Sequence, residues 1–182
     1  MARAKKPVEE YSFISIKIRD HKARVGASIN HEARDKQYQH DQLRIYRFDS
    51  SLEINGICTY PENRAGDKYE ITVYGGRPDE GDLDKRLKDF RGRDKNGDPK
   101  YRKSRGHYLP VYEIPKGVGF VQKVRGENSW NGCIWVPNQT VAMMLNLLNR
   151  MGALFIELNE RRVGRNRWIN SLTLQTTDPA YE

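Results

Sequence analysis

The chain is poor in cysteine and in apolar residues. It has two cysteines, Cys58 and Cys133, and the AVILMFWYC set makes up 37% of its 182 residues. Two cysteines without a histidine pair at finger spacing exclude a zinc-finger site. No apolar run approaches the roughly 20 residues of a membrane-spanning helix, and no apolar stretch follows the basic N-terminus as it would in a secretory signal. The sequence therefore predicts no metal, no cofactor and no membrane, and two free thiols in a reducing cytoplasm.

Motifs of catalysis are also missing. The sequence contains no Gly-x-Ser-x-Gly element and no glycine-rich loop ending in Gly-Lys-Ser/Thr. The histidines of segment 31–40 match no metal-ligand spacing. Paired catalytic carboxylates are recognised in space rather than in sequence, so any catalytic residues stay unknown. Glu157 and Glu160 are the carboxylates to inspect first.

Charge is what the chain has in excess. Its 32 Lys and Arg against 24 Asp and Glu give a net charge of +8, and charged residues make up 31% of the chain. An excess of this sign attracts polyanions and keeps a protein dispersed, but it says nothing about the fold. How the charges cluster along the chain decides between binding of polyanions and simple dispersion.

Alternation of apolar and polar residues dominates the chain. It is clear in 14–18, 52–60, 69–73, 154–158 and 168–174, and Val118, Phe120 and Val124 form a further apolar set. One apolar and one polar face per strand is typical of antiparallel sheets with one face in water. We expect a mainly β fold, with α+β as the variant: an antiparallel β-sandwich or open barrel.

One segment has helical periodicity instead. Val141, Met144, Leu145 and Leu148 fall at i, i+3, i+4 and i+7, which predicts a helix near 138–150 packed on the sheet. Asn138 is suited to cap its start.

Residues 77–106 interrupt the alternation. This segment has 11 Lys and Arg, 7 Asp and Glu and few apolar side chains. Leu83, Leu87 and Phe90 share one helical face, which predicts a short helix near 83–91 followed by a mobile loop over 91–105. The following strand, 107–114, contains Pro110 and should therefore lie at a sheet edge. Residues 1–182 are predicted to form a single β-rich domain with a charged insertion at 77–106.

The final hairpin concentrates arginine. If Leu154, Ile156 and Leu158 face the same side as Trp168 and Leu172, the loop must have an odd length. A three-residue loop Arg162–Val163–Gly164 satisfies this and places Arg161 opposite Arg165 and Leu158 opposite Trp168. Opposed like charges are destabilising, and an anion would relieve them. A solvated hairpin tip, or intramolecular pairs with the acidic residues of 79–89, is the alternative. The predicted nucleic-acid-binding residues are Arg161, Arg162, Arg165, Arg167 and Trp168.

Three functions remain open from the sequence. The first is a nucleic-acid-binding β protein without evident catalytic activity, its partner DNA or RNA. The second is a non-enzymatic protein-interaction or assembly module that uses edge strand 107–114 or the 77–106 insertion. The third is an enzyme with an unrecognised site. One continuous positive groove lined by Trp or Tyr would favour the first.

Overall fold

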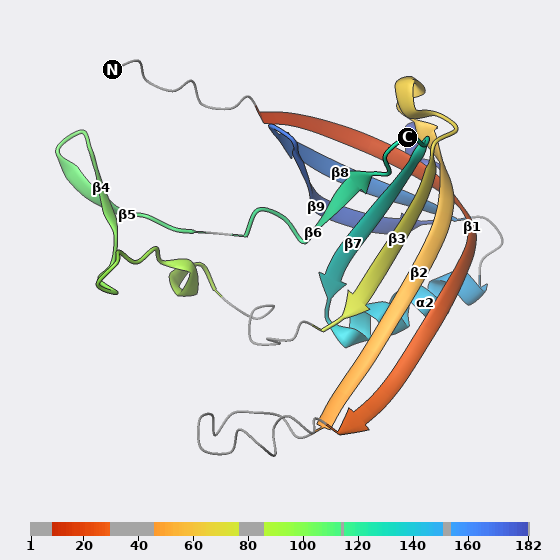
Figure 1. Ribbon diagram of the computed structural model, residues 1–182, viewed down its shortest axis with the longest axis horizontal. Helices are drawn as coiled ribbons and strands as arrows, with labels where there is room; N and C mark the ends of the chain where they lie inside the picture. Colours follow the sequence, from red (N-terminus) through yellow and green to blue (C-terminus); the bar gives the residue numbers. More distant parts are fainter. Residues whose placement is uncertain (1–8, 30–45, 77–85, 114, 151–153, 182) are drawn as a thin grey trace.

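The computed structural model describes residues 9–29, 46–76, 86–113, 115–150 and 154–181, and they form a mainly β protein with one α-helix. Seven strands close a barrel in the order β1-β2-β3-β7-β6-β9-β8, and β4 and β5 form a separate two-stranded sheet (Figure 1). The barrel strands are β1 (Glu9–Ile29), β2 (Tyr46–Tyr60), β3 (Lys68–Gly75), β6 (Gly119–Lys123), β7 (Ser129–Val136), β8 (Phe155–Val163) and β9 (Asn166–Gln175). The remaining elements are β4 (Tyr101–Ser104), β5 (His107–Pro110), α2 (Asn138–Arg150) and the 3-10 turns η1 (Glu62–Arg64), η3 (Leu87–Phe90) and η4 (Pro179–Tyr181).

The predicted β class is confirmed, and the barrel is closed rather than open. Closure comes from β8, which pairs antiparallel with β1 from Glu9↔Val163 to Lys17↔Phe155. The sheet is mixed, since β3 and β7 run parallel while the other pairs of barrel strands are antiparallel. Parallel neighbours need a long crossover. The insertion and β6 supply it, because β7 folds back from β6 to lie between β6 and β3.

On β2 and β3 the buried residues are those that the alternation of apolar and polar residues predicts. Leu52, Ile54, Tyr69, Ile71 and Val73 are all buried inside the barrel. The predicted apolar set of Val118, Phe120 and Val124 is wrong as the buried face of β6. Gly119 and Val121 are the buried residues of this strand, and Phe120 is exposed. Gly119 fits there because a Cβ would lie 2.1 Å from the carbonyl oxygen of Cys133.

The predicted helix is confirmed as α2. Its buried residues are Val141, Met144 and Leu148, and it packs on β2 and β3. The Asn138 side chain accepts a hydrogen bond from the Ser50 hydroxyl at 2.6 Å, which joins the helix start to β2. No helix in the described part of the chain has both the length and the apolar character needed to cross a membrane.

The insertion differs from its prediction. Residues 77–85 lie outside the described residues, and the described part of the expected helix is the single turn η3. Segment 91–105, predicted as a loop, instead contains the bridges Arg91↔Tyr112 and Arg93↔Pro99 and the strand β4. Arg105 and Gly106 turn the chain back with φ of 48° and 85°, as a two-residue type I′ hairpin requires. The predicted strand 107–114 is shorter in the structure, because β5 ends at Pro110. It is an edge strand as predicted, since both strands of a two-stranded sheet are edges.

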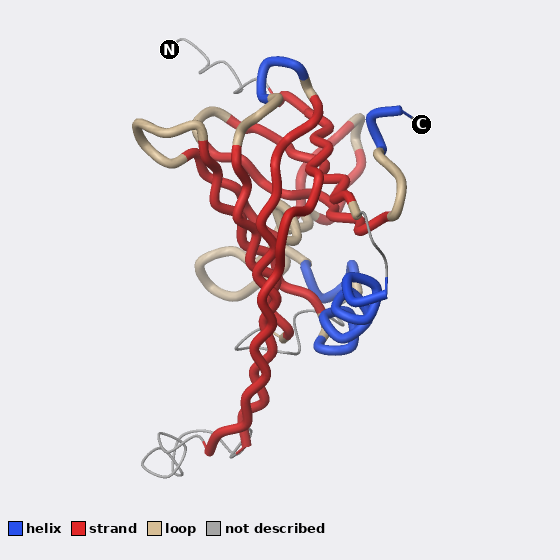
Figure 2. The backbone as a smooth tube through the Cα atoms, turned by 90° about the vertical axis from the view of Figure 1, so that its right-hand side faces the viewer, coloured by secondary structure: helices blue, strands red, loops and turns tan. Residues whose placement is uncertain are grey.

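Two β elements extend from the barrel. The β4–β5 hairpin stands apart from the barrel strands in Figure 1. The pairing of β1 with β2 continues to Ile29↔Tyr46, and Figure 2 shows this twisted ribbon running beyond the barrel.

The register of the final hairpin also differs from its prediction. Val163 pairs with Asn166, so the loop is the two-residue Gly164–Arg165 instead of Arg162–Val163–Gly164. A β-bulge beside Asn159 restores the apolar match, and Leu158 pairs with Leu172. The parity argument failed because a bulge adds one residue to one strand and changes the parity of the sum.

Candidate nucleic-acid interface

The arginines of the final hairpin are largely paired within the chain. Arg161 lies 3.4 Å from Glu9, between Nε and Oε2, and Arg162 Nη1 lies 3.2 Å from Glu10 Oε2. Both acids belong to β1, which runs beside β8, and not to segment 79–89. Arg167 forms an ion pair with Glu160. Within the described residues, Arg165 forms no ion pair.

Glu160 closes one end of the barrel as the centre of an ionic plug, which we define as Glu160, Arg64, Arg167, Tyr69 and Trp130. Glu160 is 1% exposed. Its carboxylate accepts hydrogen bonds from Arg64, at 3.1 and 3.3 Å, from Arg167 and from the hydroxyl of Ser12. The two carboxylate oxygens therefore have four donor contacts. The sequence analysis selected this carboxylate for inspection, and its contacts give it a structural role.

The aromatic residues of the plug also make structural contacts within the chain. The Tyr69 and Trp130 rings stack at 5.9 Å, and the Arg64 guanidinium lies 4.5 Å from the Trp130 ring centroid. Trp130 Nε1 donates to Asp67 at 2.8 Å. Burial raises the pKa of the Tyr69 phenol well above its usual range, although the neighbouring Arg64 acts to lower it. Trp130 is buried and offers no free face to a ligand.

A row of aromatic side chains crosses the outside of the barrel. We define the outer aromatic row as Tyr74 on β3, Trp135 on β7, Phe120 on β6 and Trp168 on β9. Tyr74 pairs with Trp135, and Phe120 pairs with Trp168. The Tyr74 and Trp135 rings stack at 6.4 Å, and Phe120 lies 6.0 Å from Trp135 in a tilted arrangement. Four adjacent strands thus contribute one ring each to the row.

The row is partly open to solvent. Tyr74 is 41% and Phe120 39% exposed, while Trp135 and Trp168 are half-buried. The predicted register placed Trp168 on the apolar face, but the bulge turns it outward, opposite Arg161. Partly exposed rings held in place by their neighbours are what base stacking needs.

Cations flank the Trp168 end of the row. Lys116 Nζ lies 5.4 Å from the Trp168 ring centroid. Arg165, Phe120 and Trp168 together line a hollow of about 250 Å³. The pairing also continues from Trp168 through Arg161 to Tyr11, which is 67% exposed on β1. Of the five predicted binding residues, Arg165, Arg161 and Trp168 therefore lie at this row. Arg167 lines the same hollow but forms an ion pair with Glu160 of the plug, and Arg162 pairs with Glu10.

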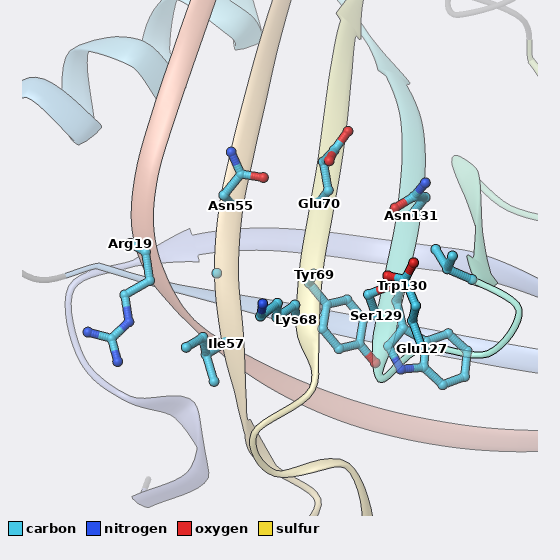
Figure 3. Close-up of a pocket in the computed structure, with 12 residues that line it drawn as sticks. Arg19, Asn55, Ile57, Lys68, Tyr69, Glu70, Glu127, Ser129, Trp130 and Asn131 are labelled. Atoms are coloured by element: carbon cyan, nitrogen blue, oxygen red, sulfur yellow. Dashed lines mark hydrogen bonds between the residues drawn. The ribbon is translucent and has the colours of Figure 1, made fainter.

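A second hollow, of about 520 Å³, lies over β1, β2, β3 and β7 (Figure 3). Asn55, Glu70 and Asn131 are paired across it on three neighbouring strands, and Arg19 lies to one side. Among the residues that the structure describes, the carboxylates that line it are Glu70 and Glu127. Within the described ranges, no group of three His, Cys, Asp or Glu residues is placed to hold a metal ion.

Neither cysteine is arranged as a nucleophile. Both thiols are free, as predicted. Burial raises the pKa of Cys58 to about 11, although a backbone hydrogen bond at Tyr60 acts to lower it. Burial also raises the pKa of Cys133. A raised pKa keeps a thiol protonated and unreactive near neutral pH.

No protein-family model, curated protein or solved structure matches the chain. The interface is therefore interpreted from its geometry and chemistry alone.

Proposed function

We propose that this protein binds single-stranded nucleic acid, DNA or RNA, across the outer aromatic row. The observation that carries the proposal is the alignment of four rings on four adjacent strands on the outer face of the barrel. Unpaired bases stack on such rings with little dependence on sequence. A duplex keeps its base faces stacked internally, so we expect it to bind more weakly.

Electrostatics support the same ligand. The chain carries a net charge of +8, and Lys116 and Arg165 lie at the Trp168 end of the row, where a phosphate backbone would pass. The free thiols fit the reducing cytoplasm that we propose as the location.

Removing a ring from the row tests the proposal directly. Trp168→Ala should weaken binding of a fluorescein-labelled oligo(dT) or oligo(U) by roughly 5- to 150-fold, the cost of one base–aromatic stack. Phe120→Leu keeps apolar bulk without a ring and should weaken binding in the same direction. Fluorescence anisotropy measures both affinities, after thermal melting has shown that the variants fold.

Tyr181 provides the control, because it is 90% exposed in η4 and lies outside the row. Tyr181→Ala should bind like the wild type. If the wild type binds neither oligonucleotide at physiological salt, or if Trp168→Ala and Tyr181→Ala behave alike, the row is not a strand-binding surface.

The arginines predict a graded dependence on salt. Arg165 has no ion-pair partner in the described residues, so Arg165→Ala should reduce the slope of log K against log salt by about 0.7, one phosphate contact on a single strand. Arg162 is already paired with Glu10, so Arg162→Ala should leave the slope nearly unchanged. A salt titration of both variants beside the wild type measures this difference. Equal slopes for all three proteins would remove Arg165 from the interface.

A further inference from the structure

The β4–β5 hairpin combines exposed rings with an excess of positive charge. We define the arm as residues 100–110, which contain Lys100, Arg102, Lys103 and Arg105 and no Asp or Glu. Tyr101 is 52% and Tyr108 71% exposed. Every residue of the arm except Pro110 is exposed.

The two tyrosines lie on one face of the arm with cations beside them. Lys103 pairs with Tyr108 and Tyr101 with Pro110, and these four residues share that face because they alternate along the strands. Lys103 Nζ lies 6.0 Å from the Tyr108 ring centroid, and the Arg91 guanidinium lies 5.1 Å from that of Tyr101. Stacking rings interleaved with cations are the features of a single-strand contact.

The arm has a defined backbone conformation but no hydrophobic core of its own. Its backbone is held by the β4–β5 pairing, the Arg105–Gly106 turn and the bridges at its base, and Lys100 Nζ lies 2.9 Å from Glu113 Oε1. A lone two-stranded hairpin is marginally stable in water. Little of this hairpin is buried, so its side chains are available to a ligand.

Both ends of the insertion that carries the arm are attached at the outer aromatic row. The chain leaves the barrel after Gly75, the residue that follows Tyr74, and re-enters it at Gly119, the residue before Phe120. Residues 111–119 can span at most roughly 30 Å when extended. The base of the arm therefore lies within that reach of the row.

We infer that the arm is a second contact for the same nucleic-acid strand, and that its tyrosines and cations lengthen the site beyond the barrel. This inference rests on the proposed function. It predicts that affinity rises in two stages with oligonucleotide length: short strands occupy the row, and longer strands also reach the arm.

An oligo(dT) length series from about 4 to about 30 nucleotides tests this, because single-strand sites on one small barrel cover about 4–16 nucleotides. The double variant Tyr101→Leu, Tyr108→Leu should bind short strands like the wild type. It should lose roughly 5-fold or more of the affinity for long strands. The matched variant Tyr101→Phe, Tyr108→Phe keeps both rings and should retain the second stage.

Hydrogen exchange of the wild type adds a measurement that does not depend on the variants folding. Long oligo(dT) should slow amide exchange in β4 and β5, and short oligo(dT) should not. Equal affinities of the Leu variant and the wild type at all lengths, together with unchanged exchange in the arm, would overturn the inference and leave the row intact. A wild type that binds no oligonucleotide at any length would overturn the proposed function as well. A change in the protein's mass by light scattering, without a change in binding, would make the arm a contact for a second copy of the chain and also overturn the inference.

Discussion

Glu160→Ala should lower the free energy of unfolding by about 3–5 kcal/mol, the cost of removing one partner from a buried ion pair. The carboxylate is 1% exposed and is bound by Arg64 and Arg167, whose side chains are 12% and 21% exposed. Without it, two guanidinium groups stay in the barrel end with no counter-charge. Urea denaturation followed by circular dichroism measures the loss.

The matched control is the exposed pair of Glu10 with Arg162. Their side chains are 61% and 45% exposed, so Glu10→Ala should change the free energy of unfolding by less than about 1 kcal/mol. If Glu160→Ala costs no more than Glu10→Ala, the ionic plug does not stabilise the barrel through this carboxylate.

Leu148→Ala should cost about 2–5 kcal/mol of the free energy of unfolding. Leu148 is 7% exposed and lies on the face of α2 that packs on β2 and β3, so truncation leaves a cavity beneath the helix. Thermal and urea unfolding measure the effect.

Asn146 lies on the same helix and is exposed, so Asn146→Ala should stay within about 0.5 kcal/mol of the wild type. Similar losses at Leu148 and Asn146 would show that the apolar face of α2 does not carry its attachment to the barrel.

The sequence predicted correctly those elements that are encoded by a periodic pattern of neighbouring residues. The β class follows from two-residue alternation, and α2 follows from the spacing of Val141, Met144 and Leu148. The predicted strand 107–114 contains β5, but β4 was missed because Tyr101–Ser104 shows no alternation of apolar and polar residues. Its turn residues, Arg105 and Gly106, were the available signal.

The candidate site depends on contacts that sequence spacing does not report. Glu9 and Glu10 reach the hairpin arginines only because β1 closes the barrel against β8. Likewise, Tyr74, Trp135, Phe120 and Trp168 form a row only after the strand order is known. Trp168 and the arginines were selected from local sequence, but the bulge beside Asn159 decides that Trp168 points outward.

Because β3 pairs in parallel with β7, the strand pairing of the barrel does not depend on the insertion. The strands that flank the insertion, β3 and β6, are both held by β7, through eight and five paired positions respectively. The register of the barrel is therefore fixed without help from the segment between them. Doubling the length of a flexible connection adds only about 0.6 kcal/mol of closure entropy. The insertion is accordingly an exchangeable module: replacing it alters what is presented beside the aromatic row while the barrel keeps its shape.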